Sequence, residues 1–319
     1  MSLNLSRSAF AARPWKDAGR DLFSPAGRLV GRPLVCWEST GRALLARLVD
    51  ERAVLVSVRQ VEGSGPREVG AWMAVFADGL LGTIGGGQIE HEAAAHARRL
   101  LGGGGGGETL RRFALGPSLG QCCGGVVHLG FERVAAEDRA ALAEGFDAAV
   151  RARMPVALFG GGHVGRAIVD VLATLPVRVH WLDSRDEDVF PAGLPPTVQA
   201  EHSDPVQAAV PTLEAGSHVL IMSFSHAEDL DIVAACLKRQ RERADLPFIG
   251  LIGSKTKWAT FRHRLEARGF SAAELAHITC PIGVPGVVGK EPQVIAVAVA
   301  AQLMQQRRPP AAGRHAKPG

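Results

Sequence analysis

The stretch from Pro155 to Arg185 constrains the fold of this chain more than any other. It reads PVALFGGGHVGRAIVDVLATLPVRVHWLDSR, in which an apolar run, a glycine turn, a helical pattern and a second apolar run follow one another. Short apolar runs bounded by turn residues are typical of buried strands. A strand, a helix and a second strand in this order predict a βαβ unit, and the chain is therefore expected to contain an α/β domain.

The turn inside this unit has the spacing GxGxxG. The first glycine permits a tight turn, the second lets a ligand approach the backbone, and the third lets the helix pack against the strand. The N–H groups and the dipole at the start of the helix favour a phosphate there, although a merely close-packed turn is the alternative. Asp183 ends the second strand, where a ribose hydroxyl is bound in dinucleotide sites. The residues predicted for this site are Gly160, Gly161, Gly162, His163, Gly165, Asp183 and Arg185.

Beyond Arg185 the alternation of apolar runs and amphipathic segments continues. It predicts a doubly wound, Rossmann-like parallel sheet, whose ligands bind at the carboxyl ends of the strands. The expected strands are 197–199, 218–222 and 248–252, and the expected helices are 228–243, 258–268 and 292–306.

Polar residues follow two of these strands. Ser254 is expected to cap a helix whose first turn carries Lys255 and Lys257, where cations are unfavourable unless an anion is bound. Solvated lysines are the simpler interpretation. His226 with Asp229 is interpreted either as an oriented imidazole or as a helix-start cap.

The first part of the chain predicts a smaller α+β domain. A helix over 38–50, a strand over 53–61, a hairpin over 71–84, a helix over 88–101 and strands over 109–114 and 126–132 are expected. The predicted organisation is a basic disordered tail (1–35), the amino-terminal domain (36–135), a linking helix (136–153), the Rossmann-like domain (154–306) and a second disordered tail (307–319).

The smaller domain contains two further glycine-rich segments. Gly86, Gly87 and Gln88 precede a helix and are predicted either to bind an anion or to form a tight packing turn. Cys122 and Cys123 lie on a loop between glycines, where a thiolate is accessible, whereas packing cysteines lie within apolar runs. Neighbouring residues in an extended segment point to opposite sides, so one thiol is expected to face the site.

Charge and cysteine content exclude several classes of protein. The formal net charge of +4 arises from the two tails, so nucleic-acid binding by a folded face is not expected. The five cysteines form no regular disulfide framework, which favours a reducing cytoplasm. The late apolar run from Val294 to Met304 is shorter than the roughly 20 residues that span a bilayer, so no membrane association is predicted.

Taken together, these motifs resemble the XdhC/CoxI family, the accessory proteins that mature xanthine dehydrogenase and related molybdenum hydroxylases. The resemblance runs from about Glu38 to Gln306, with the motifs in the family order. They are SGPR at 64–67, IGGGQIEHE at 84–92, LGQCCGG at 119–125, FGGGHVGRA at 159–167 and IGLIGSKTK at 249–257. After PIG at 281–283, Val284 to Gln293 departs from the short glycine turn common in the family.

The resemblance implies a chaperone that binds the molybdenum cofactor, shelters it during sulfuration by a cysteine desulfurase and inserts it into the apoenzyme. The expected partners are therefore a molybdenum hydroxylase apoenzyme, the desulfurase and cofactor biosynthesis proteins, with a homodimer left open. The Gly160–Gly165 turn and Lys255 would hold the pterin phosphate, and Cys122 or Cys123 would face the molybdenum. The alternative is an NAD(P)-dependent oxidoreductase. A tyrosine-based proton relay is excluded because the chain contains no tyrosine.

Overall fold

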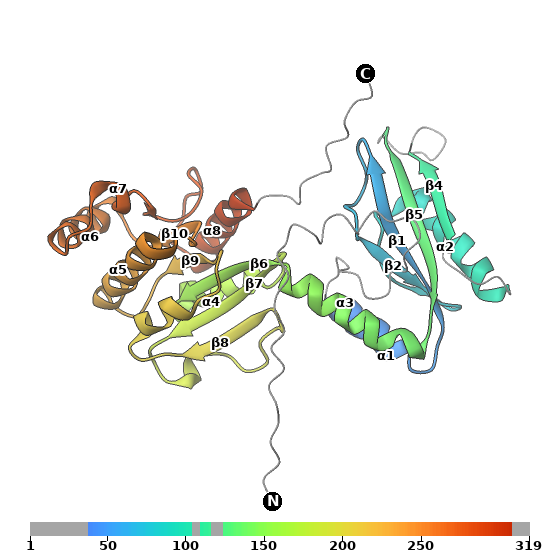
Figure 1. Ribbon diagram of the computed structural model, residues 1–319, viewed down its shortest axis with the longest axis horizontal. Coiled ribbons are helices and arrows are strands. Elements are labelled where there is room, and N and C mark those ends of the chain that lie inside the picture. Colours follow the sequence, from blue (N-terminus) through green and yellow to red (C-terminus); the bar gives the residue numbers. More distant parts are fainter. Residues whose placement is uncertain (1–37, 104–108, 116–123, 308–319) are drawn as a thin grey trace, which may run out of the picture. The chain divides into compact units, whose positions relative to one another are not determined.

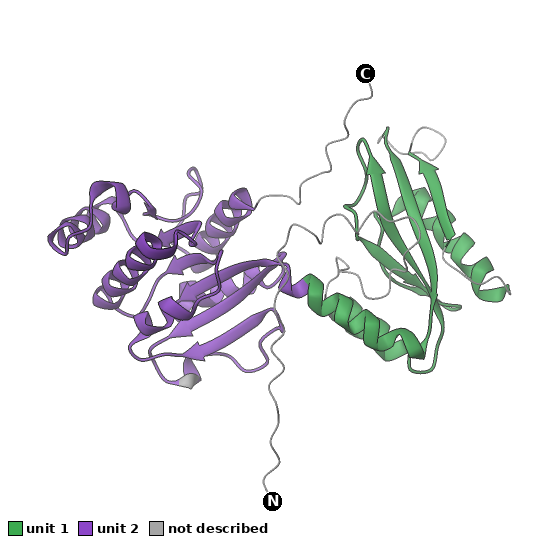
Figure 2. Ribbon diagram, in the orientation of Figure 1, with its two compact units in different colours: residues 1–149 green, residues 150–319 purple. Residues whose placement is uncertain are grey.

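The computed structural model describes residues 38–103, 109–115 and 124–307 of the 319-residue chain. The chain divides into two compact units, residues 1–149 and residues 150–319 (Figure 2). The division falls near the end of helix α3, Arg139–Arg151, which follows a short 3-10 turn at Ala136–Asp138.

The described part of unit 1 is an antiparallel sheet with helices on both faces (Figure 1). Its strands lie in the order β3-β2-β1-β5-β4, with the long strands β1 and β5 paired at the centre. The bounds are α1 Glu38–Arg47, β1 Ala53–Glu62, β2 Trp72–Val75, β3 Leu80–Gly82, α2 Gly87–Gly102, β4 Thr109–Ala114 and β5 Val126–Val134.

Alternation of side chains along the central strands gives unit 1 two apolar layers. Val54 and Val56 of β1 point to the face covered by α2, through its buried residues Ile89 and Ala93. The intervening Leu55 points to the opposite face, where α1 and α3 pack. The period of two in the strand sequence therefore decides which helix each residue contacts.

Unit 2 contains a parallel sheet in the order β11-β10-β9-β6-β7-β8 within the described residues. This is the doubly wound Rossmann order, in which the chain starts at the centre and fills one side before the other. The predicted α/β fold class is confirmed. The strands are β6 Met154–Phe159, β7 Val177–Asp183, β8 Val198–His202, β9 His218–Ile221, β10 Phe248–Leu251 and β11 Ile278–Thr279.

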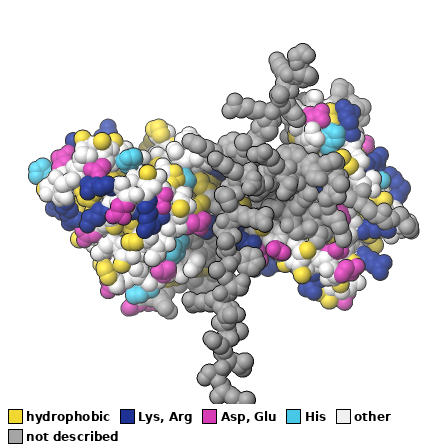
Figure 3. Space-filling model, in the orientation of Figure 1, with side chains coloured by type: hydrophobic (Ala, Val, Ile, Leu, Met, Phe, Trp, Pro, Cys, Tyr) yellow, Lys and Arg dark blue, Asp and Glu magenta, His cyan; other side chains and the backbone are white. Residues whose placement is uncertain are grey.

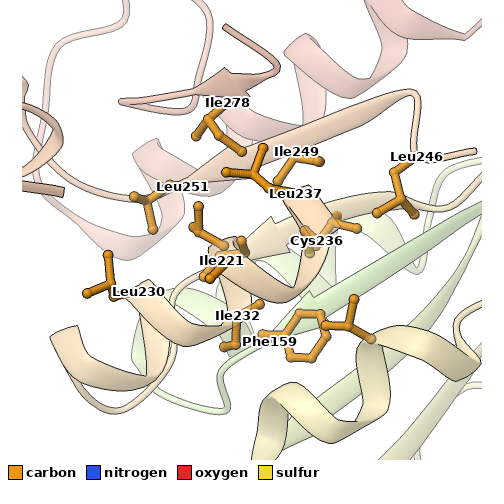
Figure 4. Close-up of a cluster of buried hydrophobic side chains, with 14 of the residues drawn as sticks. Phe159, Ile221, Leu230, Ile232, Cys236, Leu237, Leu246, Ile249, Leu251 and Ile278 are labelled. Carbon is orange, nitrogen blue, oxygen red and sulfur yellow. The ribbon is translucent and has the colours of Figure 1, made fainter. Parts of the chain in front are cut away.

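Helices cover both faces of this sheet, as a parallel sheet requires. Helices α4 (His163–Leu172) and α8 (Pro292–Gln306) pack on one face, and α5 (His226–Arg243) and α6 (Lys255–Ala267) pack on the other. Figure 4 shows the second layer, in which Phe159 and Ile221 of the sheet meet Leu230 and Leu237 of α5. The apolar runs of the strands thus contact protein on both faces.

The sequence reading missed two short elements of unit 2. These are β11 and helix α7, Ala272–Leu275, a single turn closed by a capping box at Ser271 and Glu274. A two-residue strand and a four-residue helix each extend over only about one period, so no repeating pattern could reveal them. The 3-10 helices at Glu187–Val189 and Val206–Thr212 were also missed.

The surface and the helices add two general observations. On the face drawn in Figure 3, basic and acidic side chains of unit 2 are interspersed. Among the helices within residues 38–103, 109–115 and 124–307, none has the length and apolar character needed to cross a bilayer.

Candidate functional site

The carboxyl edge of the unit 2 sheet brings together most of the residues predicted for a ligand. The chain runs outward from β6 in both directions, to β7 on one side and to β9 on the other. The point where the strand order reverses therefore lies between β6 and β9, and crevices at such points bind ligands. The glycine turn after β6 and residues Met222–Ser225 after β9 border it.

Two glycines of the turn are required by packing. Gly160 has φ of +126°, and a Cβ atom there would lie 2.0 Å from the carbonyl oxygen of Met222. A Cβ atom at Gly165 would lie 2.0 Å from the carbonyl oxygen of Gly160. Any side chain at either position would clash with backbone, so these glycines hold β6, α4 and the loop after β9 close together.

The remaining glycine of the motif, Gly162, has no such reason to be glycine. Its φ is −73°, which any residue adopts, and a Cβ atom there would meet nothing within 4 Å. It is the N-cap of α4, and none of the described side chains accepts a hydrogen bond at this helix start. By contrast, Ser225 caps α5 and Ser254 caps α6. The first N–H groups of α4, beginning at the exposed His163, are thus open to an anion.

Asp183 does not offer a free carboxylate to a ribose, which corrects one interpretation of the sequence. Its Oδ1 accepts hydrogen bonds from the backbone N–H and the Nε of Arg185, both at 2.9 Å. Its Oδ2 accepts from Nη2 of Arg185 at 2.8 Å and from the N–H of Gly161. Burial favours a raised pKa for Asp183, but the hydrogen bonds and charge of Arg185 outweigh it, and the pKa lies below its usual value.

An exposed aromatic side chain lies beside this pair and was missed in the sequence. Phe224 is 68% exposed, and the Cζ atom of Arg185 lies 5.1 Å from the centre of its ring. Nearby, the hydroxyl of Ser184 donates to Oε1 of Glu228 at 2.7 Å. A single phenylalanine in a polar loop has no periodic signal. The indication in the sequence was an aromatic residue in the loop that follows a strand of a parallel sheet.

The predicted pairing of His226 with Asp229 is wrong. Asp229 is buried and accepts hydrogen bonds from Nζ of Lys257 at 2.6 Å, and from the N–H and hydroxyl of Ser223 at 2.8 and 2.7 Å. His226 instead lies edge-on to Phe261, with ring centres 6.3 Å apart. A lysine brought in from the next helix provides the charge that a buried carboxylate requires, so Asp229 is a structural residue.

The two lysines at the start of α6 differ in role. Ser254 caps this helix by accepting from the N–H of Lys257 at 3.2 Å, as the sequence predicted. The ammonium of Lys257 donates hydrogen bonds to Asp229 and, at 2.9 Å, to the carbonyl oxygen of Ile252. Lys255 is exposed and forms no salt bridge with a described residue. Only Lys255 of the pair is therefore free to bind an anion.

In unit 1, the glycine turn before α2 already binds a side-chain carboxylate of the protein, that of Glu90. Oε2 of Glu90 accepts hydrogen bonds from the hydroxyl of Thr83 at 2.6 Å and from the N–H groups of Ile84 and Gly86, each at 3.1 Å. The carboxylate reaches back from within the helix to bind its own entry loop. Of the three residues predicted here for an anion, Gly86 has its N–H occupied, and only Gly87 and Gln88 remain.

Three motif loops of unit 1 lie against one another. A Cβ atom at Gly85 would lie 2.5 Å from Cβ of Pro66, and one at Gly125 would lie 2.2 Å from the carbonyl oxygen of Ser64. The N–H of Leu115 donates to the carbonyl oxygen of Gly125 at 2.8 Å, which brings together the two ends of the loop between them. The predicted thiols Cys122 and Cys123 lie outside the described residues.

Burial disfavours the thiolate form of the two described cysteines, Cys236 and Cys280. Burial raises the pKa of Cys236 to about 12, and it also raises the pKa of Cys280. Cys236 belongs to the apolar cluster drawn in Figure 4. Within residues 38–103, 109–115 and 124–307, no group of three or more His, Cys, Asp or Glu residues is arranged to hold a metal ion.

A doubly wound sheet with an open helix start after its first strand defines a Rossmann-domain protein. The particular family follows from two matches: a model of the XdhC Rossmann domain matches residues 156–303, and a model of the XdhC and CoxI family matches residues 46–114. The chain belongs to the XdhC and CoxI family.

Two similar proteins extend this comparison. The uncharacterized protein YqeB of Escherichia coli (strain K12) is 26% identical over 277 residues, which are 86% of this chain and 45% of YqeB. The chain thus spans about half the length of the curated relative it matches. A crystal structure described as a xanthine dehydrogenase from Bacillus halodurans has a TM-score of 0.66 and 20% identity, and the match covers 83% of this chain and 95% of that one. This second likeness concerns the fold.

Proposed function

We propose that this protein is a maturation factor for xanthine dehydrogenase or a related molybdenum hydroxylase, and that its cargo is the molybdenum cofactor. It receives the cofactor from biosynthesis proteins, holds it in the cytoplasm while a cysteine desulfurase exchanges an oxo ligand for sulfur, and releases it to the apoenzyme. In this role the protein is a carrier. Family membership and the chemistry of the unit 2 turn support the proposal.

The observation that carries the proposal is the combination of Gly162 with the uncapped start of α4. The protein itself does not require glycine at this position, because a Cβ atom would enter open space. A ligand that approaches the backbone closely does require it. A terminal phosphate matches the free N–H groups, and the molybdenum cofactor ends in a phosphate.

The remaining residues have proposed roles around this phosphate. Gly160 and Gly165 shape the turn, and Gly161 ties it to Asp183 through its N–H. His163 is exposed at the start of α4, and Lys255 is proposed to supply a cation at the same sheet edge. Cys122 or Cys123 is proposed to face the molybdenum, since a soft metal centre favours thiolate. Gly87 and Gln88 are the part of the unit 1 turn left for a polar contact.

A second function, NAD(P)-dependent oxidoreduction, is favoured by the Rossmann strand order and the GxGxxG turn. The hydrogen bonds of Asp183 weigh against this function, because both carboxylate oxygens already accept from Arg185 or Gly161 and not from a ribose. The maturation role is therefore the better supported of the two.

The test is a pair of titrations of the full chain, one with isolated molybdenum cofactor and one with NAD(P). We expect nanomolar to micromolar cofactor binding that weakens in Cys122→Ala or Cys123→Ala. Cys236→Ala, which removes a thiol buried in the core, is the matched control and should bind as wild type does. Nucleotide binding without cofactor binding would overturn the proposal in favour of the oxidoreductase.

A further inference from the structure

We propose that Arg185 determines the ligand specificity of the unit 2 site by occupying the place of a nucleotide ribose, so that the site accepts a phosphate but rejects an ADP moiety. The inference rests on the proposed phosphate site at the Gly160–Gly165 turn. It concerns a different part of the ligand, however, and is tested without the molybdenum cofactor.

The hydrogen bonds of Asp183 carry the inference. A carboxylate has about four acceptor positions, two on each oxygen. Arg185 fills three of them, with its N–H, Nε and Nη2 at 2.8 to 2.9 Å, and the N–H of Gly161 fills the fourth. A ribose diol needs free positions on this carboxylate in order to donate its hydroxyls. None is left, and a nucleotide could bind only by displacing Arg185.

The surroundings of the pair favour this closed arrangement. The side chain of Asp183 is 1% exposed, whereas that of Arg185 is 35% exposed and covers it. The guanidinium also lies over the exposed ring of Phe224, where a planar cation is attracted to the aromatic face. Two planar contacts thus hold Arg185 in place, and displacing it would leave a buried charge without its partner.

The same arginine could in principle bind the 2′-phosphate of NADP. In the structure, however, Nε and Nη2 of Arg185 donate to Asp183, and the negative charge of this carboxylate opposes a phosphate bound to the remaining N–H donors. The inference therefore predicts that NADP is rejected together with ADP-ribose.

Calorimetric titration of the full chain with ADP-ribose, and separately with NADP, tests the inference. Arg185→Met keeps the aliphatic stem but removes the two side-chain donors to Asp183, Nε and Nη2, so that two of the four acceptor positions become free. We expect this variant to bind ADP-ribose at least about tenfold more tightly than wild type, since hydrogen bonds to a charged group become available. Adding Asp183→Asn to Arg185→Met should abolish the gain, because it removes the negatively charged acceptor. Arg178→Met is the matched control, in which we expect no gain, because Arg178 lies on the strand that ends at Asp183 but pairs with Glu214.

Thermal unfolding of each variant shows whether it folds. If Arg185→Met does not fold, Arg185→Lys keeps a cation beside Asp183 but lacks the parallel donors, and it should show a smaller gain. The inference is overturned if neither variant gains ADP-ribose affinity, or if wild type already binds ADP-ribose or NADP as tightly as Arg185→Met does. If only the cofactor-binding proposal is wrong, wild type will not bind molybdenum cofactor, whereas Arg185→Met will still gain affinity for ADP-ribose.

Discussion

At the scale of single residues, the glycines of the GxGxxG turn are glycine for different physical reasons. Gly165 is glycine because the protein leaves no room, with backbone 2.0 Å from the position of its Cβ atom. Gly162 faces open space, so packing against the described residues does not require glycine there. Under the proposed function Gly165 is a structural position and Gly162 a binding position, and substitutions can separate these two roles.

Gly162→Val is expected to weaken molybdenum cofactor binding by about tenfold or more, which corresponds to about 1.4 kcal/mol. The valine side chain would occupy the space through which the phosphate reaches the N–H groups of α4. The thermal midpoint should change little, because φ and the free space at Gly162 both allow a side chain. Cofactor titration together with thermal unfolding measures both effects.

Gly165→Val is the matched contrast. It should destabilise unit 2 by about 3 kcal/mol or more, because its side chain would overlap the carbonyl of Gly160. If Gly162→Val bound the cofactor as wild type does, the turn would not be part of the site.

At the scale of secondary structure elements, the starts of the helices are stabilised in different ways. Helices α5, α6 and α7 begin at serines that cap them, and the start of α2 is held by Glu90 from its own first turns. A buried ion pair, Lys257 with Asp229, then ties the start of α6 to the start of α5 and to the loop after β9. These contacts join the starts of α5 and α6 and the loop after β9 at the carboxyl edge of the sheet.

Lys257→Met is expected to destabilise the protein by about 3 to 5 kcal/mol, because it leaves the buried Asp229 without its countercharge. The measurement is urea unfolding. Arg268→Met is the matched control, since it breaks the exposed pair with Asp231 and should cost less than about 1 kcal/mol. Equal costs for the two variants would contradict the structural role assigned to the buried pair.

At the scale of the whole molecule, stability is expected to fall as the solution becomes acidic. Burial lowers the pKa of His218, which lies in β9 of the unit 2 core. The unfolded chain then takes up a proton from about pH 6.5 downward, while the folded protein resists it. Stability is complete above the unfolded pKa and decreases as the pH falls through the folded pKa. The lowered pKa of Asp183 adds a second loss in the same direction, below about pH 4.

The midpoint of urea unfolding, measured from neutral pH down to about pH 5, should therefore decrease in wild type. His218→Gln should flatten this decrease, because its amide does not titrate. His163→Gln is the matched control, since that side chain is exposed and should leave the slope as it is. A slope that His218→Gln leaves unchanged would assign the pH dependence to other groups.

Local signals in the sequence were sufficient for the larger elements. Strands such as β6 and β9 and helices such as α8 follow from apolar runs, periodicity and turn residues, which depend on neighbours in the chain. The elements that escaped, β11 and α7, are too short to show a period. The α/β class and the doubly wound order followed from the alternation of strand and helix.

The sequence by itself determined where the glycine turn lies, which strand precedes it and that an α/β sheet surrounds it, because these are properties of adjacent residues. Only the tertiary structure decided which polar groups are free. Asp183 accepts hydrogen bonds from Arg185 and Gly161. Asp229 pairs with Lys257 and not with His226. The N–H of Gly86 donates to Glu90. Each polar group bonds to the donor or acceptor that folding brings nearest, and distance along the chain does not reveal that choice.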